Sequence, residues 1–297
     1  MFALPSLDAL RTSGHEVALV VTQPDRPAGR GQKTTPPPVA AYAHEHGLPL
    51  WQTATLRGLE AEERLRALAP EAMALAAFAA LVPKNVLDVA PGGILNVHPS
   101  LLPRWRGATP IQAALLAGDP QTGVSIIRLV QALDAGPILL QEAVPISTED
   151  DYVTLEPRLA ALGARLLVRA LEERPRPRPQ DDDAATFCQR IEREDARVDW
   201  TRSASDIWNA VRAYRGWPQA FTTFEGRLLK VLRASPVSGD GEPGRVSVED
   251  GVPIVATGDG RLRLDEVQLE GRRAMTGAEL ARGYTSLNGA KLGIVPM

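Results

Sequence analysis

Short apolar runs alternate with amphipathic stretches along the first half of the chain. Apolar runs without polar alternation predict buried strands at residues 16–22, 48–52, 72–80, 95–98, 122–129 and 138–144. Apolar positions at helical spacing, often ended by glycine, predict helices at residues 6–13, 38–46, 59–68, 83–89, 111–117 and 152–173. Strand following helix in this way predicts an α/β fold, with an open, mostly parallel, doubly wound (Rossmann-like) sheet.

The pattern changes after residue 173. Arginine and proline alternate over residues 174–179 and three aspartates follow, a composition that predicts an extended, semi-rigid linker. Beyond it, one helix and several short strands separated by glycine-containing turns predict a smaller β-barrel (OB-like) or sandwich; the helix is expected at 204–213 and the strands at 221–224, 228–234, 244–248, 252–256 and 261–267. We therefore expect a first domain at 1–173, a linker at 174–198 and a carboxyl-terminal domain at 199–297.

Composition narrows the class of protein. The 297 residues are 44% hydrophobic and 23% charged, as is ordinary for a globular protein, and no run of about 18 apolar residues predicts a membrane helix. The net charge of −3 gives no overall attraction to nucleic acid, although residues 201–297 carry 13 Lys and Arg against 11 Asp and Glu. Cys188 is the only cysteine, which excludes an internal disulfide and, with no secretion signal, favours a cytoplasmic location.

The first candidate chemistry lies in residues 94–110. If residues 95–98 form a strand, Asn96 and His98 point from the same face, because side chains alternate along a strand. Pro99 and Pro103 then end the strand and restrict the loop that follows. Open α/β sheets commonly build their active sites from polar groups at strand ends. The same pattern would also arise if His98 were a hydrogen-bonded interior histidine with a structural role only.

Asp134 is the carboxylate that could complete this pair. It precedes Ala135-Gly136, so it could also serve only as a turn former. If the three groups converge, Asn96 and His98 could stabilise an oxyanion while Asp134 handles a proton, which suits acyl transfer to an amine without a covalent intermediate. Ser100 lacks the turn of a serine nucleophile, and no cluster with metal-ligand spacing is present, so we expect no metal.

The stretch at 23–33 combines two prolines, two glycines and three cations: Arg26, Arg30 and Lys33. Such a composition favours a solvated surface loop over the alternative, a basic arm for phosphates.

Several of these stretches together carry a resemblance to a known family. The signature of the 10-formyltetrahydrofolate-dependent formyltransferases is similar to Asn96-Val97-His98-Pro99-Ser100-Leu101-Leu102-Pro103 combined with Leu133-Asp134-Ala135-Gly136. The stretches at 22–31, 212–218, 258–260 and 267–275 narrow the resemblance to the methionyl-tRNA formyltransferase family. The likeness covers nearly the whole chain.

The resemblance implies an enzyme that moves the formyl group of 10-formyltetrahydrofolate to the α-amine of methionyl initiator tRNA, in translation initiation. It implies that Asn96, His98 and Asp134 are catalytic and that Ser100, Leu101, Leu102 and Pro103 hold the folate through their backbone. It also implies that the stretch at 23–33 enters the acceptor arm, with Arg26, Arg30 and Lys33 as tRNA contacts. The carboxyl-terminal domain would lie on the tRNA backbone. No long coiled-coil pattern appears, so we expect a monomer.

The chain departs from the family at its start. The family begins with an apolar strand and a turn before Phe-Ala, whereas this sequence begins at Met1-Phe2-Ala3. We therefore expect a sheet that lacks its first, central strand and leaves backbone groups of its neighbours unpaired.

Three other functions share parts of this pattern. Glycinamide ribonucleotide or amino-sugar formyltransferases would carry the same catalytic motif without the basic stretch and the carboxyl-terminal pattern. A hydrolase that transfers the formyl group to water and releases formate would also share the core. A non-catalytic RNA-binding protein could keep the same fold.

Overall fold

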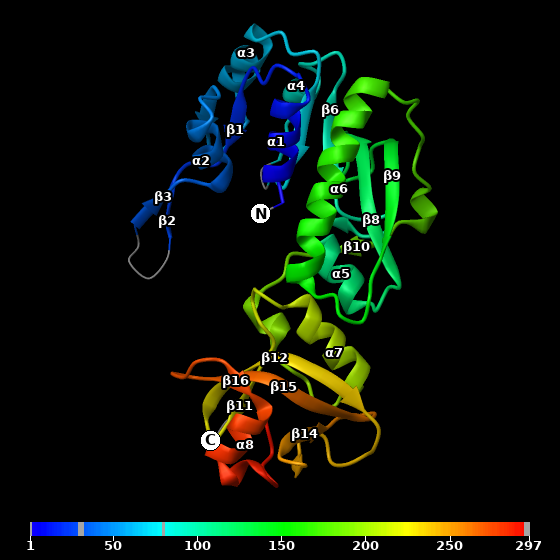
Figure 1. The fold of residues 1–297 in the computed structure, drawn as a ribbon. Coiled ribbons are helices and arrows are strands. Elements are labelled where there is room, and N and C mark those ends of the chain that lie inside the picture. The colour runs from blue at the N-terminus through cyan, green and yellow to red at the C-terminus, as the bar shows by residue number, and fades with distance from the viewer. Residues whose placement is uncertain (1, 29–32, 79–80, 294–297) are drawn as a thin grey trace. The chain divides into compact units, whose positions relative to one another are not determined.

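The structure is a computed structural model that describes residues 2–28, 33–78 and 81–293 (Figure 1). Its contacts divide the chain into two compact units. Unit 1 comprises residues 1–110, 121–145 and 155–188, and unit 2 comprises residues 111–120, 146–154 and 189–297. The predicted division into domains at 1–173 and 199–297, with a linker at 174–198, stays a prediction.

The largest sheet of unit 1 has four strands in the order β5-β6-β8-β9. Their bounds are Met73–Ala76, Ile94–His98, Gln121–Arg128 and Ile138–Pro145. β5 and β6 are parallel, as a strand–helix–strand crossover requires, whereas β8 and β9 are added antiparallel. A second, parallel pair is formed by β1 (Val20–Thr22) and β4 (Leu50–Gln52). The α/β fold expected from the sequence is therefore confirmed.

Helices lie close to the predicted positions along the chain. Those that begin in the first 116 residues are α1 (Leu4–Thr12), α2 (Pro38–Glu45), α3 (Leu59–Ala67), α4 (Lys84–Leu87) and α5 (Pro110–Leu116). The long α6 (Tyr152–Glu173) buries its leucine-rich face against the sheet. Gly163 allows this close approach, because a Cβ atom there would lie 2.5 Å from Cγ1 of Val97 in β6.

The sheet of unit 1 is interrupted between β1 and β5. β1 pairs with β4 and β5 with β6, and within the described residues neither has a second strand partner. Both strands line a cavity of about 1290 Å³, together with side chains of α1 and α6 such as Leu7 and Leu167. The buried hydroxyl of Ser6, also in its wall, has no partner among the described residues. Within the described residues, the sheet of unit 1 is thus broken between β1 and β5.

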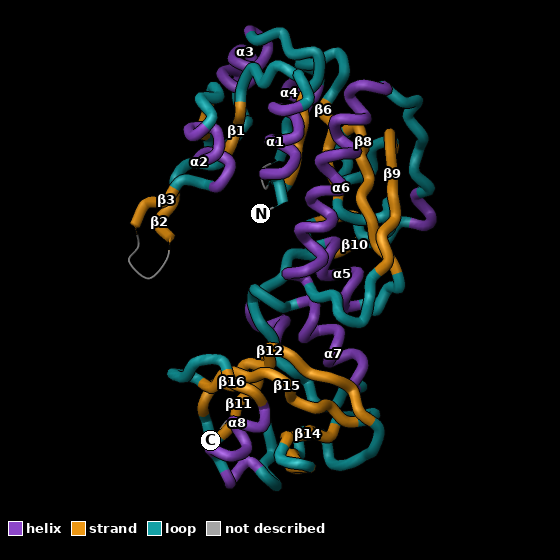
Figure 2. Tube along the Cα trace, in the orientation of Figure 1, coloured by secondary structure: helices purple, strands orange, loops and turns teal. Residues whose placement is uncertain are grey.

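The basic stretch is not a plain loop. Residues Arg26–Ala28 form β2 and Lys33–Thr35 form β3, and the two pair antiparallel as a hairpin that Figures 1 and 2 show beside α2. Gln52 of β4 anchors its base, because its side-chain amide donates to the Asp25 carboxylate at 2.6 Å. Glycine and proline in this stretch hide the strand pairing from sequence patterns.

Residues 174–188 run along unit 1. Arg178 exchanges backbone hydrogen bonds with Ile138, and β10 (Phe187–Cys188) pairs in parallel with β7 (Arg106–Gly107). A short 3₁₀ helix, Asp182–Ala184, lies within this segment, and another, Arg193–Ala196, belongs to unit 2. This segment therefore borders the loop that follows β6.

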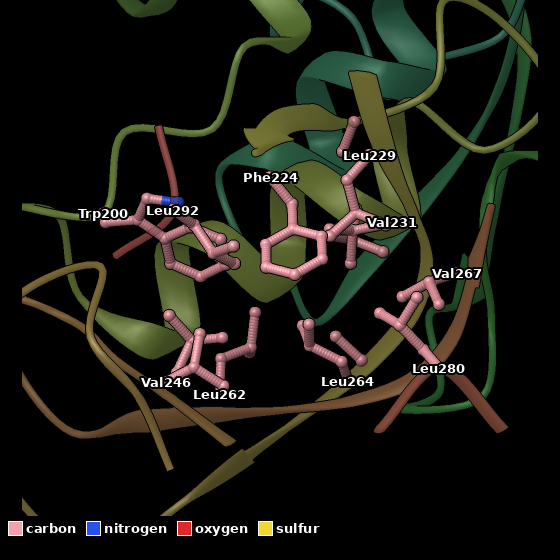
Figure 3. Packing of buried hydrophobic residues seen from close by; sticks show 14 of the residues in the cluster. Trp200, Phe224, Leu229, Val231, Val246, Leu262, Leu264, Val267, Leu280 and Leu292 are labelled. Atoms are coloured by element: carbon pink, nitrogen blue, oxygen red, sulfur yellow. The ribbon is translucent and has the colours of Figure 1, made fainter. Parts of the chain in front are cut away.

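Unit 2 is built on a curled antiparallel sheet in the order β11-β12-β15-β14-β13, with β16 beside β15. These strands span Phe221–Phe224, Arg227–Val237, Arg261–Leu269, Val252–Ala256, Val246–Glu249 and Met275–Thr276, and the helices are α7 (Ala204–Ala213), α8 (Gly277–Gly283) and a 3₁₀ turn at Thr285–Leu287. Figure 3 shows Phe224 among buried leucines and valines of this core, with Trp200 at one side. The predicted small β-barrel is thereby confirmed as a curled, partly open sheet.

Across the described residues, we find no helix whose length and apolarity would let it span a bilayer.

Candidate active site

β6 delivers the two polar side chains singled out by the sequence. Asn96 and His98 lie two residues apart on this strand and are only 6% and 4% exposed. Both point toward Asp134, whose Oδ1 accepts a long hydrogen bond from Nδ2 of Asn96 at 3.5 Å and whose Oδ2 lies 3.7 Å from Nδ1 of His98. The structure therefore brings the three predicted catalytic residues together.

Asp134 is held by backbone geometry as well as by these neighbours. Its φ of +47° lies in the left-handed region, which non-glycine residues rarely adopt outside tight turns. Its Oδ2 accepts a hydrogen bond from the backbone N–H of Gly107 at 2.9 Å. Gly107 cannot be replaced there without movement, because a Cβ would lie 2.1 Å from the carbonyl oxygen of Cys188. Asp134 is thus buried and fixed in place.

The protonation of His98 follows from its contacts. Its Nε2 lies 2.9 Å from the carbonyl oxygen of Trp105, which can only accept, so Nε2 carries the hydrogen. Burial lowers the pKa of His98 below its usual 6.5, although the Asp134 carboxylate and the Trp105 carbonyl each act to raise that pKa. His98 is therefore neutral at pH 7, with a bare Nδ1 facing Asp134.

This arrangement can accept a proton. Nδ1 of His98 and Oδ2 of Asp134 are both acceptors, and their separation of 3.7 Å leaves room for a proton delivered from a third group. Asn96 uses one amide hydrogen on Asp134 and has a second for another acceptor. The cluster can thus take a proton from an attacking group and donate to a developing negative oxygen.

The predicted folate segment follows β6 directly. The side chains of Ser100 and Leu102 are buried. The backbone of Leu102 is already engaged, because its N–H donates to Oγ of Ser125 and its carbonyl accepts from Gln141. Within the described residues, the N–H of Leu101 donates no hydrogen bond. A folate contact by the segment Ser100, Leu101, Leu102 and Pro103 stays a prediction, with Leu101 as its available donor.

The predicted tRNA contacts lie on the β2–β3 hairpin. Arg26 is exposed, and its Nη2 donates to Oε1 of Gln23 at 3.0 Å. Lys33 begins β3, and Arg30 lies outside the described residues. The described residues hold no cluster of three His, Cys, Asp or Glu side chains placed to bind a metal ion.

Three contributors to the site escaped the sequence patterns: the carbonyl of Trp105, the N–H of Gly107 and the side chain of Gln180, whose Nε2 donates to the Asp134 carbonyl at 2.7 Å. The first two act through their backbone. The glycine that follows Arg106 was a usable signal for Gly107, whereas nothing local marks Gln180, which lies 46 residues from Asp134.

Comparison with known families identifies both halves of the chain. Residues 2–171 match the formyl transferase family model, and residues 190–285 match the model of the formyl transferase carboxyl-terminal domain.

Curated relatives are similar over nearly the whole length. The chain is 46% identical to the methionyl-tRNA formyltransferase of Thermus thermophilus, with 99% of this chain and 97% of that protein covered. It is 45% identical to the methionyl-tRNA formyltransferase of Dechloromonas aromatica, with 95% of this chain and 93% of the relative covered.

Solved structures share the fold at low sequence identity. A methionyl-tRNA formyltransferase from Clostridium thermocellum has a TM-score of 0.52 at 18% identity and covers 73% of this chain and 92% of its own. WlaRD, a sugar 3N-formyl transferase crystallised with dTDP and 5-N-formyl-THF, has a TM-score of 0.65 at 15% identity and covers 92% of this chain and 95% of its own.

Proposed function

The chain belongs to the methionyl-tRNA formyltransferase family, and on that premise we propose that its Asn96–His98–Asp134 site transfers a formyl group to methionyl initiator tRNA. The donor is 10-formyltetrahydrofolate, and the acceptor is the α-amine of the esterified methionine. The observation that carries the assignment is the convergence of an amide and a neutral imidazole on one carboxylate, at 3.5 and 3.7 Å from its two oxygens. These groups supply acceptor and donor sites but no serine or cysteine nucleophile, so we assign the attacking and the leaving nitrogen to the two substrates.

The amine attacks the formyl carbon and forms a tetrahedral intermediate. As the new C–N bond forms, Asp134 takes the proton that the amine loses, either directly or shared with Nδ1 of His98. A proton at Nδ1 turns His98 into a donor, and together with the second amide hydrogen of Asn96 it stabilises the oxyanion by roughly 3–4 kcal/mol per well-placed donor. Breakage of the bond to N10 then releases tetrahydrofolate, with the proton returned to N10.

Folate would lie against the loop after β6. Leu101 is the residue of the Ser100–Pro103 segment whose N–H is available, and it sits between buried neighbours that fix its position. The hydrogen bonds of Ser125 and Gln141 to this loop hold the backbone before any ligand arrives, which lowers the entropy lost on binding.

The tRNA would be held by basic side chains rather than by net charge. Arg26, which is exposed in β2, would contact the acceptor stem of the tRNA, and Arg30 and Lys33 would contact the same stem. The sheet of unit 2 would lie on the tRNA backbone. We propose a cytoplasmic location, supported by the role in translation and by the single cysteine, and a monomer, supported by the lack of a long coiled-coil pattern in the sequence.

One assay tests the assignment. Purified protein is incubated with 10-formyltetrahydrofolate and, in parallel, with methionyl initiator tRNA, an amino-sugar nucleotide or buffer alone. We expect formyl-methionyl-tRNA as the product and negligible formate release. Transfer to the sugar amine in preference to the tRNA, or formate release at the same rate without an acceptor, would reject the proposed acceptor.

A further inference from the structure

The loop that carries Asp134 is held by a side chain from the segment that follows α6. Nε2 of Gln180 donates to the carbonyl oxygens of both Asp134 and Gly136, each at 2.7 Å. Oε1 of the same carboxamide accepts from Nε and Nη2 of Arg106 at 3.0 and 2.8 Å. The amide thus joins the Asp134 loop to a guanidinium.

The orientation of this carboxamide is determined by its partners. Two carbonyl oxygens require the NH₂ group on one side, and a guanidinium requires an oxygen on the other. The reverse orientation would set the carboxamide oxygen against the two carbonyl oxygens and its NH₂ group against the N–H groups of the guanidinium. Arg106 is itself fixed, since its side chain is 6% exposed and its Nη2 also binds Oδ1 of Asp182 at 2.6 Å. Charge-assisted bonds of this kind are stronger than neutral ones.

The Asp134 loop has little freedom to absorb a change. Asp134 adopts a left-handed φ, and Gly136 packs so closely that a Cβ would lie 1.8 Å from the carbonyl oxygen of Arg128. Arg106 precedes Gly107, whose N–H binds the Asp134 carboxylate. Gln180 and Arg106 therefore act on both ends of one residue: the carboxamide holds its backbone, and the neighbouring peptide holds its carboxylate.

We propose that Gln180 is a positioning residue that acts through Asp134 to set the geometry of proton removal during formyl transfer. This role rests on the proposed function. Gln180 touches no reacting atom, so its loss displaces the carboxylate without removing it. Misplacement of a catalytic group by about 1 Å can lower a rate by roughly 100-fold.

Two substitutions of Gln180 distinguish the loss of its hydrogen bonds from the loss of its side-chain volume. Gln180→Ala removes both bonds to the loop, and Gln180→Glu keeps the size and the contact with Arg106 but sets an oxygen against two carbonyl oxygens. We expect each to lower kcat by roughly 10- to 100-fold and to leave the KM for 10-formyltetrahydrofolate within about twofold. Gln131→Ala, at an exposed glutamine of the same loop, is the matched control and should leave kcat unchanged.

A double-mutant cycle distinguishes positioning from general damage. In an Asp134→Asn background, Gln180→Ala should change the single-turnover rate by less than about twofold, because the group through which it acts is already gone. Equal losses in both backgrounds would overturn the positioning role, as would Gln180 variants with the kcat of the parent. Thermal unfolding and folate titration verify that each variant is folded. A parent chain that formylates no acceptor would instead overturn the proposed function, and this role with it.

Discussion

Replacement of Asp134 by asparagine is the sharpest test of the site, because it removes the charge and keeps the shape. The carboxylate has two acceptor duties: Oδ2 accepts from the Gly107 N–H at 2.9 Å, and Oδ1 accepts from Nδ2 of Asn96 at 3.5 Å. An asparagine has one oxygen for the two. We expect that oxygen to accept the shorter bond, from the N–H of Gly107, which leaves the new NH₂ group facing the amide of Asn96.

The structural and catalytic costs of Asp134→Asn differ in size. An unsatisfied buried donor costs about 1–3 kcal/mol, and the 3.5 Å spacing puts this case at the lower end. Loss of a general base lowers a rate by roughly 10² to 10⁴. At about 1.36 kcal/mol per tenfold change in rate, this corresponds to roughly 3–5 kcal/mol of transition-state stabilisation. Turnover should therefore fall far more than the free energy of unfolding.

The assay follows label from 10-formyltetrahydrofolate into methionyl-tRNA under single-turnover conditions, alongside urea unfolding of the same samples. Asp88→Asn, at an exposed position at the end of α4, is the matched control and should behave like the parent. A variant Asp134→Asn with a rate within tenfold of the parent would refute the role of Asp134 as proton acceptor. An equal loss in rate and in stability would show that the residue acts through folding.

Three further predictions follow from named contacts. Because the pKa of His98 is lowered, the unfolded state binds more protons than the folded state below pH 6.5. The free energy of unfolding should therefore be highest above that pH and decline as the pH falls toward the lowered pKa, by at most about 1.4 kcal/mol per pH unit. Urea unfolding of the parent and of His98→Gln at several pH values measures this decline, and identical pH slopes would refute it. Arg26→Ala should raise the KM for tRNA, leave the KM for folate unchanged and reduce the slope of log affinity for tRNA against log salt concentration by about 0.9. Arg57→Ala, at another exposed arginine, is the control. An unchanged slope in Arg26→Ala would show that Arg26 does not contact the tRNA. In β1, the N–H of Val20 donates to the carbonyl of Pro49 in the neighbouring chain segment. Successive N–H groups of a strand point to opposite sides, so the N–H of Val21 faces the cavity and should exchange with deuterium much faster than the N–H of Val20. Equal protection of the two amides would contradict the broken sheet.

Local patterns in the sequence determined the parts of the site that depend on near neighbours. The alternation of side chains along a strand is enough to put Asn96 and His98 on one face, and the structure confirms it in β6. Hydrophobic periodicity likewise located most helices and strands to within a few residues.

Only the tertiary structure decided the contacts made across long stretches of chain. Asp134 meets His98 because its loop folds back over the end of β6, and Gln180 reaches that loop from 46 residues away. The hairpin of β2 and β3 was hidden because pairing between strands leaves no local periodicity in a stretch rich in glycine and proline. Local patterns fix which way a side chain points from its own element, whereas the meeting of an imidazole, a carboxylate and a carboxamide depends on packing that no single segment encodes.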